Sequence, residues 1–160
     1  MISEIRPAHH AALLDLNARF VHWLSPLDAN GLAELLGRCG YARQIGGAAF
    51  LLGYRGDGPY SHKNLDWLSE RLDAPYAYID RVIVAPEFAR QGHARALYGD
   101  FAAWAAAQGI GQLACEVNTR PANPASHVFH AELGFTPLGE ADYGDLAVRY
   151  YSKALTPPAG

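Results

Sequence analysis

The sequence predicts a mixed α/β fold in which a largely antiparallel central sheet is flanked by helices on both faces. Segments rich in β-branched and aromatic residues alternate along the chain with segments whose apolar residues recur at helical spacing. The pair Gly46-Gly47 separates two of the β-rich segments and predicts a hairpin. The last two β-rich segments, 135–139 and 147–153, have no helical pattern between them and are expected to pair antiparallel.

The individual elements follow from local patterns and from their boundary residues. Ser25-Pro26 interrupts the chain, and Asp28 can cap the helix that follows. Gly109 is expected to end the longest helix, and Asn123 to cap the next one. We expect helices at 8–20, 28–36, 64–72, 91–108 and 124–133, and strands at 2–6, 42–45, 48–54, 76–84, 112–118, 135–139 and 147–153, with 76–84 central.

Length and composition bound the class of protein. The 160 residues are half hydrophobic, which predicts a single domain over residues 1–155, with residues 156–160 as a disordered tail. A net charge of −3 argues against nucleic acid or an anionic membrane as the main partner. Cys39 and Cys115 are expected to be buried, reduced thiols. With no signal-peptide pattern and no apolar stretch of membrane-spanning length, a cytoplasmic protein is expected, and a homodimer is left open.

The most informative stretch is the turn at 90–95, which joins the central strand to the longest helix. A helix N-terminus leaves several backbone N–H groups without partners and carries a partial positive charge. Gly92 lets a ligand approach the backbone closely, and Arg90 and Arg95 add positive charge. These features predict a docking site for a pyrophosphate. The turn lacks the Gly-Lys-Ser/Thr of a P-loop and the three-glycine spacing of a dinucleotide fingerprint.

Two blocks of residues are similar to the signatures of a known superfamily. Residues 84–97, with the motif V-x-P-x-x-x-R-Q-G-H-A followed by Leu97, resemble the acetyl-coenzyme A loop of the GNAT superfamily of N-acetyltransferases. Residues 123–135, NPASHVFHAELGF, are similar to the second signature of that superfamily. The blocks occur in the superfamily's order, and the resemblance covers residues 76–140.

The resemblance implies the acetyltransferase architecture and acetyl-coenzyme A as co-substrate. It further implies transfer of the acetyl group to an amine of a small-molecule or peptide acceptor, by direct attack in a ternary complex. Backbone amides of the strand before the loop would bind the oxyanion, and its edge would pair with the pantetheine arm. The implied cofactor-binding residues are Val82, Ile83, Val84, Arg90, Gln91, Gly92, His93, Ala94, Arg95, Asn123, Ser126 and Phe129.

The chain departs from the superfamily's pattern at two places. Ala89 stands where Arg or Gln is usual, and Arg90 stands where a Gly is common. His130 lies seven residues after Asn123, where relatives commonly have the Tyr that protonates the leaving thiolate. An imidazole can donate this proton, so His130 is predicted to be the catalytic acid. The alternative is that His130 packs on its helix and hydrogen-bonds to a backbone carbonyl.

Two carboxylates are candidates for the base that takes the amine proton. Asp80 lies in the central strand and Glu116 in the next, and a carboxylate in such an apolar strand needs a partner or a function. Arg81 adjoins Asp80, but neighbouring strand residues point to opposite faces, so no direct ion pair is expected. The alternatives are that Asp80 accepts hydrogen bonds from loop amides, and that water carries the proton away.

Acceptor-binding residues are expected outside the two signature blocks. Side chains of the first interhelical turn and of the polar segment after the hairpin could hold a cation or a ring, and each could equally cover the edge of the core. The candidates are Trp23, Ser25, Asp28, Tyr60, Asn64 and Trp67. His9, His10 and His62 lack companions at metal-ligand spacing, so they are expected to be solvated and no metal is expected.

Three other functions stay open on the sequence. A coenzyme A-binding regulator of the same fold would bind the cofactor without catalysis. An O-acyltransferase would use a hydroxyl acceptor, and an unrelated α/β protein would bind a nucleotide at the loop. Thiol release with a panel of amines separates an enzyme from a regulator, and competition of coenzyme A with adenosine nucleotides tests the nucleotide-binding alternative.

Overall fold

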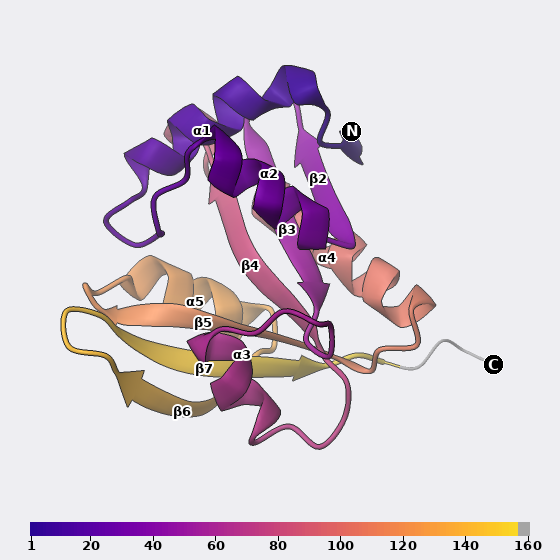
Figure 1. The fold of residues 1–160 in the computed structure, drawn as a ribbon, viewed down its shortest axis with the longest axis vertical. Coiled ribbons are helices and arrows are strands. Elements are labelled where there is room, and N and C mark those ends of the chain that lie inside the picture. Colours follow the sequence, from indigo (N-terminus) through magenta and orange to yellow (C-terminus); the bar gives the residue numbers. More distant parts are fainter. Residues whose placement is uncertain (157–160) are drawn as a thin grey trace. The chain divides into compact units, whose positions relative to one another are not determined.

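The computed structural model describes residues 1–156, and its strands form one mixed sheet in the order β1-β2-β3-β4-β5-β7-β6 (Figure 1). The ladder between β4 and β5 is parallel, whereas the β1–β2, β2–β3, β5–β7 and β6–β7 ladders are antiparallel. The strands are β1 Ile2–Glu4, β2 Tyr41–Ile45, β3 Ala49–Arg55, β4 Ala77–Val84, β5 Gln112–Arg120, β6 Thr136–Asp142 and β7 Ala147–Ala154. This confirms the predicted mixed, largely antiparallel sheet.

The helices agree with the predicted segments. Five α-helices and two short 3-10 helices lie in the described residues. The α-helices are α1 His10–Arg19, α2 Ala29–Arg38, α3 Lys63–Ser69, α4 His93–Ala107 and α5 Pro124–Glu132, and the 3-10 helices are η1 Pro7–His9 and η2 Pro86–Phe88. None of the helices within residues 1–156 is both long and apolar enough to cross a membrane.

The chain divides into two compact units, each with its own buried residues. The first unit is Met1–Tyr54 with Ile79–Trp104, and the second is Arg55–Tyr78 with Ala105–Gly160. Strand β4 continues from the second unit, which holds its first two residues, into the first unit. Residues predicted to be functional occur in both units.

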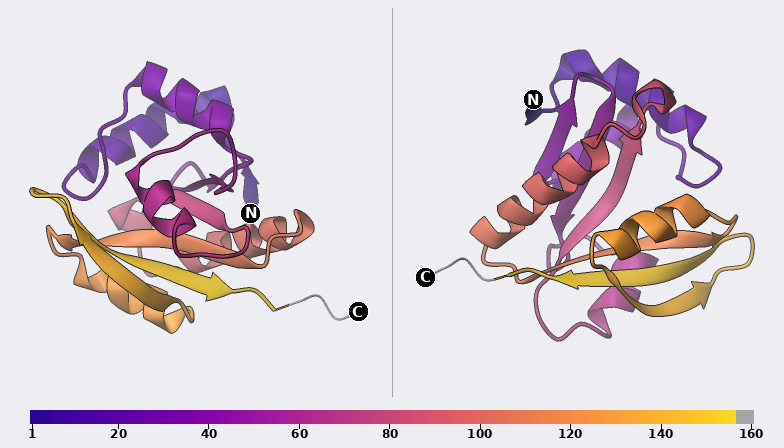
Figure 2. Two further views of the ribbon diagram at one scale, coloured as in Figure 1. Left: turned by 60° about the horizontal axis from the view of Figure 1, so that its bottom comes forward. Right: turned by 180° about the vertical axis from the view of Figure 1, so that it is seen from behind.

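In the first unit, helices cover both faces of strands β2 to β4. Helices α1 and α2 lie on one face, and the view from behind shows α4 on the other (Figures 1 and 2). Leu13, Leu32, Phe50 and Phe101 are almost completely buried between these layers. The predicted cap of α2 is confirmed, because the Asp28 carboxylate accepts a hydrogen bond of 2.7 Å from the Gly31 amide.

The predicted hairpin at Gly46-Gly47 is confirmed. The two glycines have φ angles of 58° and 65°, the left-handed conformation that a type I′ turn requires at both central positions, and the Ala48 amide donates to the Ile45 carbonyl at 3.0 Å. Strands β2 and β3 pair around it from Ile45–Ala49 to Tyr41–Gly53. The turn therefore sets the register of the first three strands.

In the second unit, α3 and α5 cover opposite faces of strands β5, β7 and β6 (Figure 2). Neighbouring residues of β7 show this alternation directly. The Tyr150 ring stacks on Trp67 of α3, with ring centroids 4.0 Å apart, and the Tyr151 ring stacks on His130 of α5 at 5.8 Å. Each helix is thus held to its face by an aromatic pair.

Three local expectations need correction or fall outside the described residues. The long helix begins at His93 rather than at residue 91, because Arg90 and Gly92 have φ angles of 63° and 81°, which no right-handed helix accommodates. Asn123 occupies the N-cap position of α5, but its side chain makes no capping hydrogen bond. Of the predicted tail 156–160, residues 157–160 lie outside the described residues.

Candidate active site

The loop before α4 presents an unbroken row of unbonded backbone amides. Within residues 1–156, none of the N–H groups from Arg90 to Arg95 donates a hydrogen bond, and the first to do so is Ala96, to the Gly92 carbonyl at 2.9 Å. The loop precedes a helix of 15 residues, whose macrodipole places partial positive charge at this end. Six adjacent donors at a helix N-terminus are suited to binding a phosphate.

Space and charge at this loop also favour an anion. A Cβ atom added at Gly92 would have no atom within 4 Å, so the backbone faces open space there. The side chains of Arg90 and Arg95 are exposed, and neither enters an ion pair within the described part of the chain. Gln91 is exposed, and His93 and Ala94 are half-buried. The predicted cofactor-binding residues of the loop therefore lie together around one solvent-facing backbone turn.

The strand before the loop is exposed in alternation. Ile83 is buried, whereas Val82 and Val84 are half-buried. The β4–β5 ladder pairs Ala77 with Leu113 and Tyr78 with Ala114, both at the start of β4. The predicted pairing of residues 82–84 with a pantetheine arm stays a prediction.

Asp80 is fully engaged by neighbouring side chains, and one expectation about it is wrong. Arg81 Nε donates to Asp80 Oδ1 at 2.8 Å, and the two side chains are 8% and 13% exposed. The Tyr54 hydroxyl donates to Asp80 Oδ2 at 2.9 Å. The alternation of strand residues fixes only the direction of each Cβ atom, and the long arginine side chain bends back to the neighbouring carboxylate. The contacts of Asp80 fit the alternative of a structural acceptor, with side chains in place of loop amides.

Arg81 links this carboxylate to the turn between α1 and α2. Its Nη1 donates to the Asn17 side-chain oxygen at 2.8 Å and to the Ser25 carbonyl at 3.3 Å, and its Nη2 donates to Ser25 Oγ at 3.2 Å. Asn17 is completely buried and also donates to the Ser25 carbonyl at 3.0 Å. Ser25, predicted to bind the acceptor, thus has a structural partner. Trp23, another candidate in this turn, packs edge-on against His22 with ring centroids 4.9 Å apart.

Glu116, the other candidate base, lies in a different environment in the second unit. Its Oε1 accepts a hydrogen bond from the Tyr78 hydroxyl on β4. The Asn64 amide of α3 donates to the Tyr78 oxygen at 3.5 Å, and the Tyr150 hydroxyl donates to the Asn64 side-chain oxygen at 2.8 Å. The Tyr143 hydroxyl lies 2.7 Å from that of Tyr150. The carboxylate is therefore the end of a chain of neutral polar side chains.

An aromatic wall lies beside this chain. The Arg71 guanidinium lies 3.7 Å from the Trp67 ring centroid. The same Trp67 ring forms the stacked pair with Tyr150 described above. Burial raises the pKa of the Tyr150 phenol, which keeps this hydroxyl protonated and able to donate. Of the predicted acceptor residues, the structure brings Asn64 and Trp67 together with Glu116, whereas Tyr60 is 43% exposed.

The sequence interpretation missed Tyr78, Tyr143 and Tyr150. Tyr78 lies two residues before Asp80 in the same strand, so the side chains of the two residues point to the same face of the sheet. This spacing is the local sequence feature that could have identified Tyr78. His62 was expected to be solvated, but its ring accepts from the Leu65 amide as the cap of α3 and lies 5.4 Å from the Tyr78 ring. That expectation is wrong.

His130 lies in the core of the second unit. The residue is 3% exposed. Its Nδ1 lies 2.7 Å from the Ser126 carbonyl oxygen, and because a carbonyl oxygen only accepts, Nδ1 must carry the proton. The ring packs edge-on against Phe129 and Phe135, and burial lowers its pKa. These contacts are those of the packing alternative, and the catalytic acid role of His130 stays a prediction.

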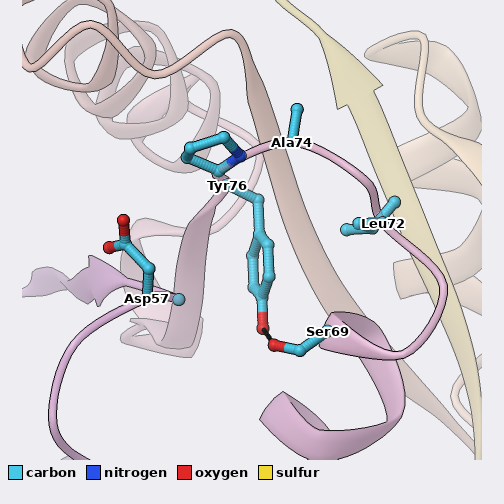
Figure 3. A pocket seen from close by; sticks show the side chains of 7 residues that line it. Asp57, Ser69, Leu72, Ala74 and Tyr76 are labelled. Carbon is cyan, nitrogen blue, oxygen red and sulfur yellow. Dashed lines mark hydrogen bonds between the residues drawn. The ribbon is translucent and has the colours of Figure 1, made fainter.

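A small pocket of about 180 Å³ lies elsewhere in the second unit (Figure 3). On one side, the Tyr76 hydroxyl lies 2.9 Å from Ser69 Oγ. The lining residues are Gly56, Asp57, Ser69, Leu72, Ala74, Pro75 and Tyr76, none of which was predicted to belong to the site. In residues 1–156, no three His, Cys, Asp or Glu side chains form a group that could hold a metal ion.

Comparisons with known proteins agree with this geometry. Residues 28–135 match the model of the Acetyltransferase (GNAT) family. No curated protein sequence matches the chain.

Three solved structures illustrate the similarity of the fold. Naa20 from Chaetomium thermophilum, in complex with a bisubstrate analogue, has a TM-score of 0.75 at 17% identity, covering 97% of this chain and 86% of that one. NAA60 from Arabidopsis thaliana, in complex with acetyl-CoA, has a TM-score of 0.73 at 10% identity, covering 96% and 98%. The ribosomal-protein-alanine N-acetyltransferase from Brucella melitensis has a TM-score of 0.68 at 18% identity, covering 97% and 99%. At these identities the likeness concerns the fold.

Proposed function

Because the chain belongs to the Acetyltransferase (GNAT) family, we propose that it transfers an acetyl group from acetyl-coenzyme A to an amine. The single observation that carries this proposal is the row of unbonded amides from Arg90 to Arg95 at the N-terminus of α4. These donors, with two exposed arginines beside them, fit the pyrophosphate of coenzyme A. The acetyl-CoA bound in the similar Arabidopsis structure supports the choice of co-substrate.

The proposed reaction is direct attack of the amine on the thioester. The amine nitrogen forms a bond to the acetyl carbonyl carbon, the carbon–sulfur bond breaks, and the thiolate leaves. From the neutral amine, the nitrogen loses one proton and the thiolate gains one, so no other reactant is needed. The ammonium form must first give a further proton to a base, which passes it to solvent. An amine near neutral pH is mostly protonated, so a base that removes its proton accelerates the reaction.

We assign the base to Glu116 rather than to Asp80. Asp80 has one oxygen in an ion pair with Arg81 and the other on the Tyr54 hydroxyl, so protonating it would break a buried pair. Glu116 is held by the neutral Tyr78 hydroxyl and is half-buried beside the aromatic wall. A carboxylate held by a neutral phenol can both attract an ammonium group and take up its proton.

The acceptor is proposed to be an amine of a small molecule or of a peptide. The similar structures include one described as a ribosomal-protein-alanine N-acetyltransferase. This description supports testing peptide N-termini first. Asn64 and Trp67 lie next to the Glu116 chain and are the residues through which α3 would contact the acceptor.

The test is release of free thiol from acetyl-coenzyme A with a panel of peptide N-terminal amines, small amines and hydroxyl compounds. We expect turnover with at least one amine, and a loss of about 10²–10⁴-fold in Glu116→Gln with unchanged binding of coenzyme A. The matched variant Asp80→Asn should keep its turnover at temperatures where it is folded. Binding of coenzyme A without turnover on any amine would favour the regulator, and turnover on hydroxyl compounds alone would favour the O-acyltransferase.

A further inference from the structure

The hydroxyl and amide protons of the chain that ends on Glu116 can be placed by elimination. A carboxylate accepts only, so the single Tyr78 hydroxyl proton points to Glu116. The Tyr78 oxygen must then accept from Asn64, which turns the amide nitrogen of Asn64 to Tyr78 and its oxygen to Tyr150. An amide flipped the other way would leave two acceptors facing each other.

The same logic extends outward to the surface. The Tyr150 hydroxyl donates its single proton to the Asn64 side-chain oxygen. In the 2.7 Å contact between the Tyr143 and Tyr150 hydroxyls, Tyr143 must therefore be the donor. Tyr143 is 37% exposed, and Lys63 Nζ lies 4.3 Å from its ring centroid. All four donors therefore point the same way, from the surface to the carboxylate.

We propose that Asn64 is a positioning residue that orients this donor chain toward Glu116 and thereby sets the pH range in which Glu116 is ionised. A donor aimed at a carboxylate favours the charged form of that group, and each hydrogen bond of a chain polarises the next. An asparagine amide is not a proton carrier, so the chain positions and polarises Glu116 without conducting protons away from it. The consequence for catalysis rests on the function proposed above.

Other charged and titratable groups surround the chain and enter any measurement of its pH dependence. They come from the end of β4, from α3 and its cap, from β5 and from the β6–β7 hairpin. They are Tyr78, His62, Lys63, Arg71, Cys115, Tyr143 and Tyr150.

The test is direct titration of the Glu116 carboxyl carbon by ¹³C NMR in the full-length protein. Asn64→Asp replaces the donor facing Tyr78 with a second acceptor, so two carboxylates compete for one phenol proton, and the pKa of Glu116 should rise by about one unit. Tyr78→Phe removes the donor itself and should also raise it. Gln112→Glu, the same amide-to-carboxylate change on β5 outside the chain, should leave it nearly unchanged.

Two results would overturn the proposal: no rise in Asn64→Asp and Tyr78→Phe, or an equal rise in Gln112→Glu, which would indicate bare charge repulsion. With an active amine, the acidic limb of kcat/KM should move upward in Asn64→Asp by the same amount as the NMR pKa. Because the NMR titration needs no turnover, absence of activity on every amine would overturn the proposed function and leave this inference to be decided by the titration.

Discussion

The two candidate bases lie in two units of the chain that hold a half-buried carboxylate in opposite ways. In the first unit, Asp80 is neutralised by a buried guanidinium, which is itself held by Asn17 and the Ser25 turn. In the second unit, Glu116 is the end of a chain of neutral donors. The first arrangement fixes the structure, because removing either charge leaves the other buried and unpaired.

In the second arrangement a neutral phenol donates to the carboxylate, and this is the environment we propose for a base that takes up a proton. The same contrast separates the tasks proposed for the two units. In the proposed function, the loop at Gly92 in the first unit would bind the phosphates of the cofactor, and Glu116 in the second unit would be the base. Changes in the first unit should therefore alter stability or cofactor affinity, and changes in the second should alter turnover and its pH dependence.

The largest effect on stability is expected for Asp80→Asn. Loss of this charge leaves the Arg81 guanidinium buried beside a neutral amide, and breaking a buried pair costs about 3–5 kcal/mol. Denaturant unfolding should show this loss as a lower free energy of unfolding. Glu116→Gln keeps an acceptor for the Tyr78 hydroxyl, so its free energy of unfolding should fall by less than about 1.5 kcal/mol. Equal losses in the two variants would remove the contrast between the two carboxylates.

Gly92→Glu should weaken binding of coenzyme A by about a hundredfold, since placing like charges together costs several kcal/mol. The new side chain would project from a backbone with φ of 81° into the open space that the phosphates are proposed to occupy. Calorimetric titration measures the affinity. Gly99→Glu is the matched control, because it adds the same charge on the exposed side of α4 with no atom within 4 Å of the new Cβ. Unchanged affinity in Gly92→Glu would disconnect the loop from the cofactor.

Arg90→Gly should stabilise the fold while weakening the cofactor complex. A non-glycine residue in the left-handed region costs about 1–2 kcal/mol, and glycine removes this cost. Glycine also raises the chain entropy of the unfolded state, which offsets part of the gain. The free energy of unfolding should therefore rise by up to about 1 kcal/mol. Coenzyme A affinity should fall several-fold through loss of one exposed cation. Arg95→Ala, which removes a cation from a residue in the helix, should weaken binding without any gain in Tm, and a matching gain there would refute the strain argument.

The smallest effect concerns His130 and pH. Its folded pKa is lowered by burial, so as the pH falls below about 6.5 the unfolded chain takes up a proton that the folded chain does not. The stability contributed by the neutral ring is present above this pH and is lost toward lower pH. His130→Phe should therefore flatten the decline of the unfolding free energy between about pH 6.5 and 5, by less than about 1 kcal/mol.

His22→Phe, the same substitution at an exposed histidine, is the control for this experiment. The same His130→Phe protein also tests catalysis. The packing contacts lead us to expect turnover within a few-fold of the wild type at neutral pH. A fall of about 10²–10⁴-fold, with coenzyme A affinity kept, would instead establish His130 as the acid.

Features that depend on neighbours in the chain could be predicted. The turn at Gly46-Gly47 and the cap at Asp28 follow from residue types at fixed short spacings, and both are present. The prediction for Asn123 shows the limit of this approach, because the residue stands at the N-cap position while its side chain does not cap. A position in the helix follows from the pattern, but the rotamer also depends on what packs around it.

Contacts between polar side chains could not be predicted in the same way. The strand rule placed Asp80 and Arg81 on opposite faces, yet they form an ion pair, because a side chain with several rotatable bonds reaches around the strand when a buried partner is available. No rule of spacing connects Arg81 to Asn17, which is 64 residues away.

By itself, the sequence determined the mixed α/β fold and a helix that begins just after Gly92 with unbonded backbone amides. Both arise from hydrogen bonding and periodicity within a few residues. Only the tertiary structure decided which carboxylate is neutralised by a cation and which is held by neutral donors. The partners of Glu116 show why: Tyr78 is 38 residues from it, and Asn64 is 86 residues from Tyr150. A buried polar group must take whichever donor the packing of distant elements brings to it, and that choice is made when the sheet and its helices assemble.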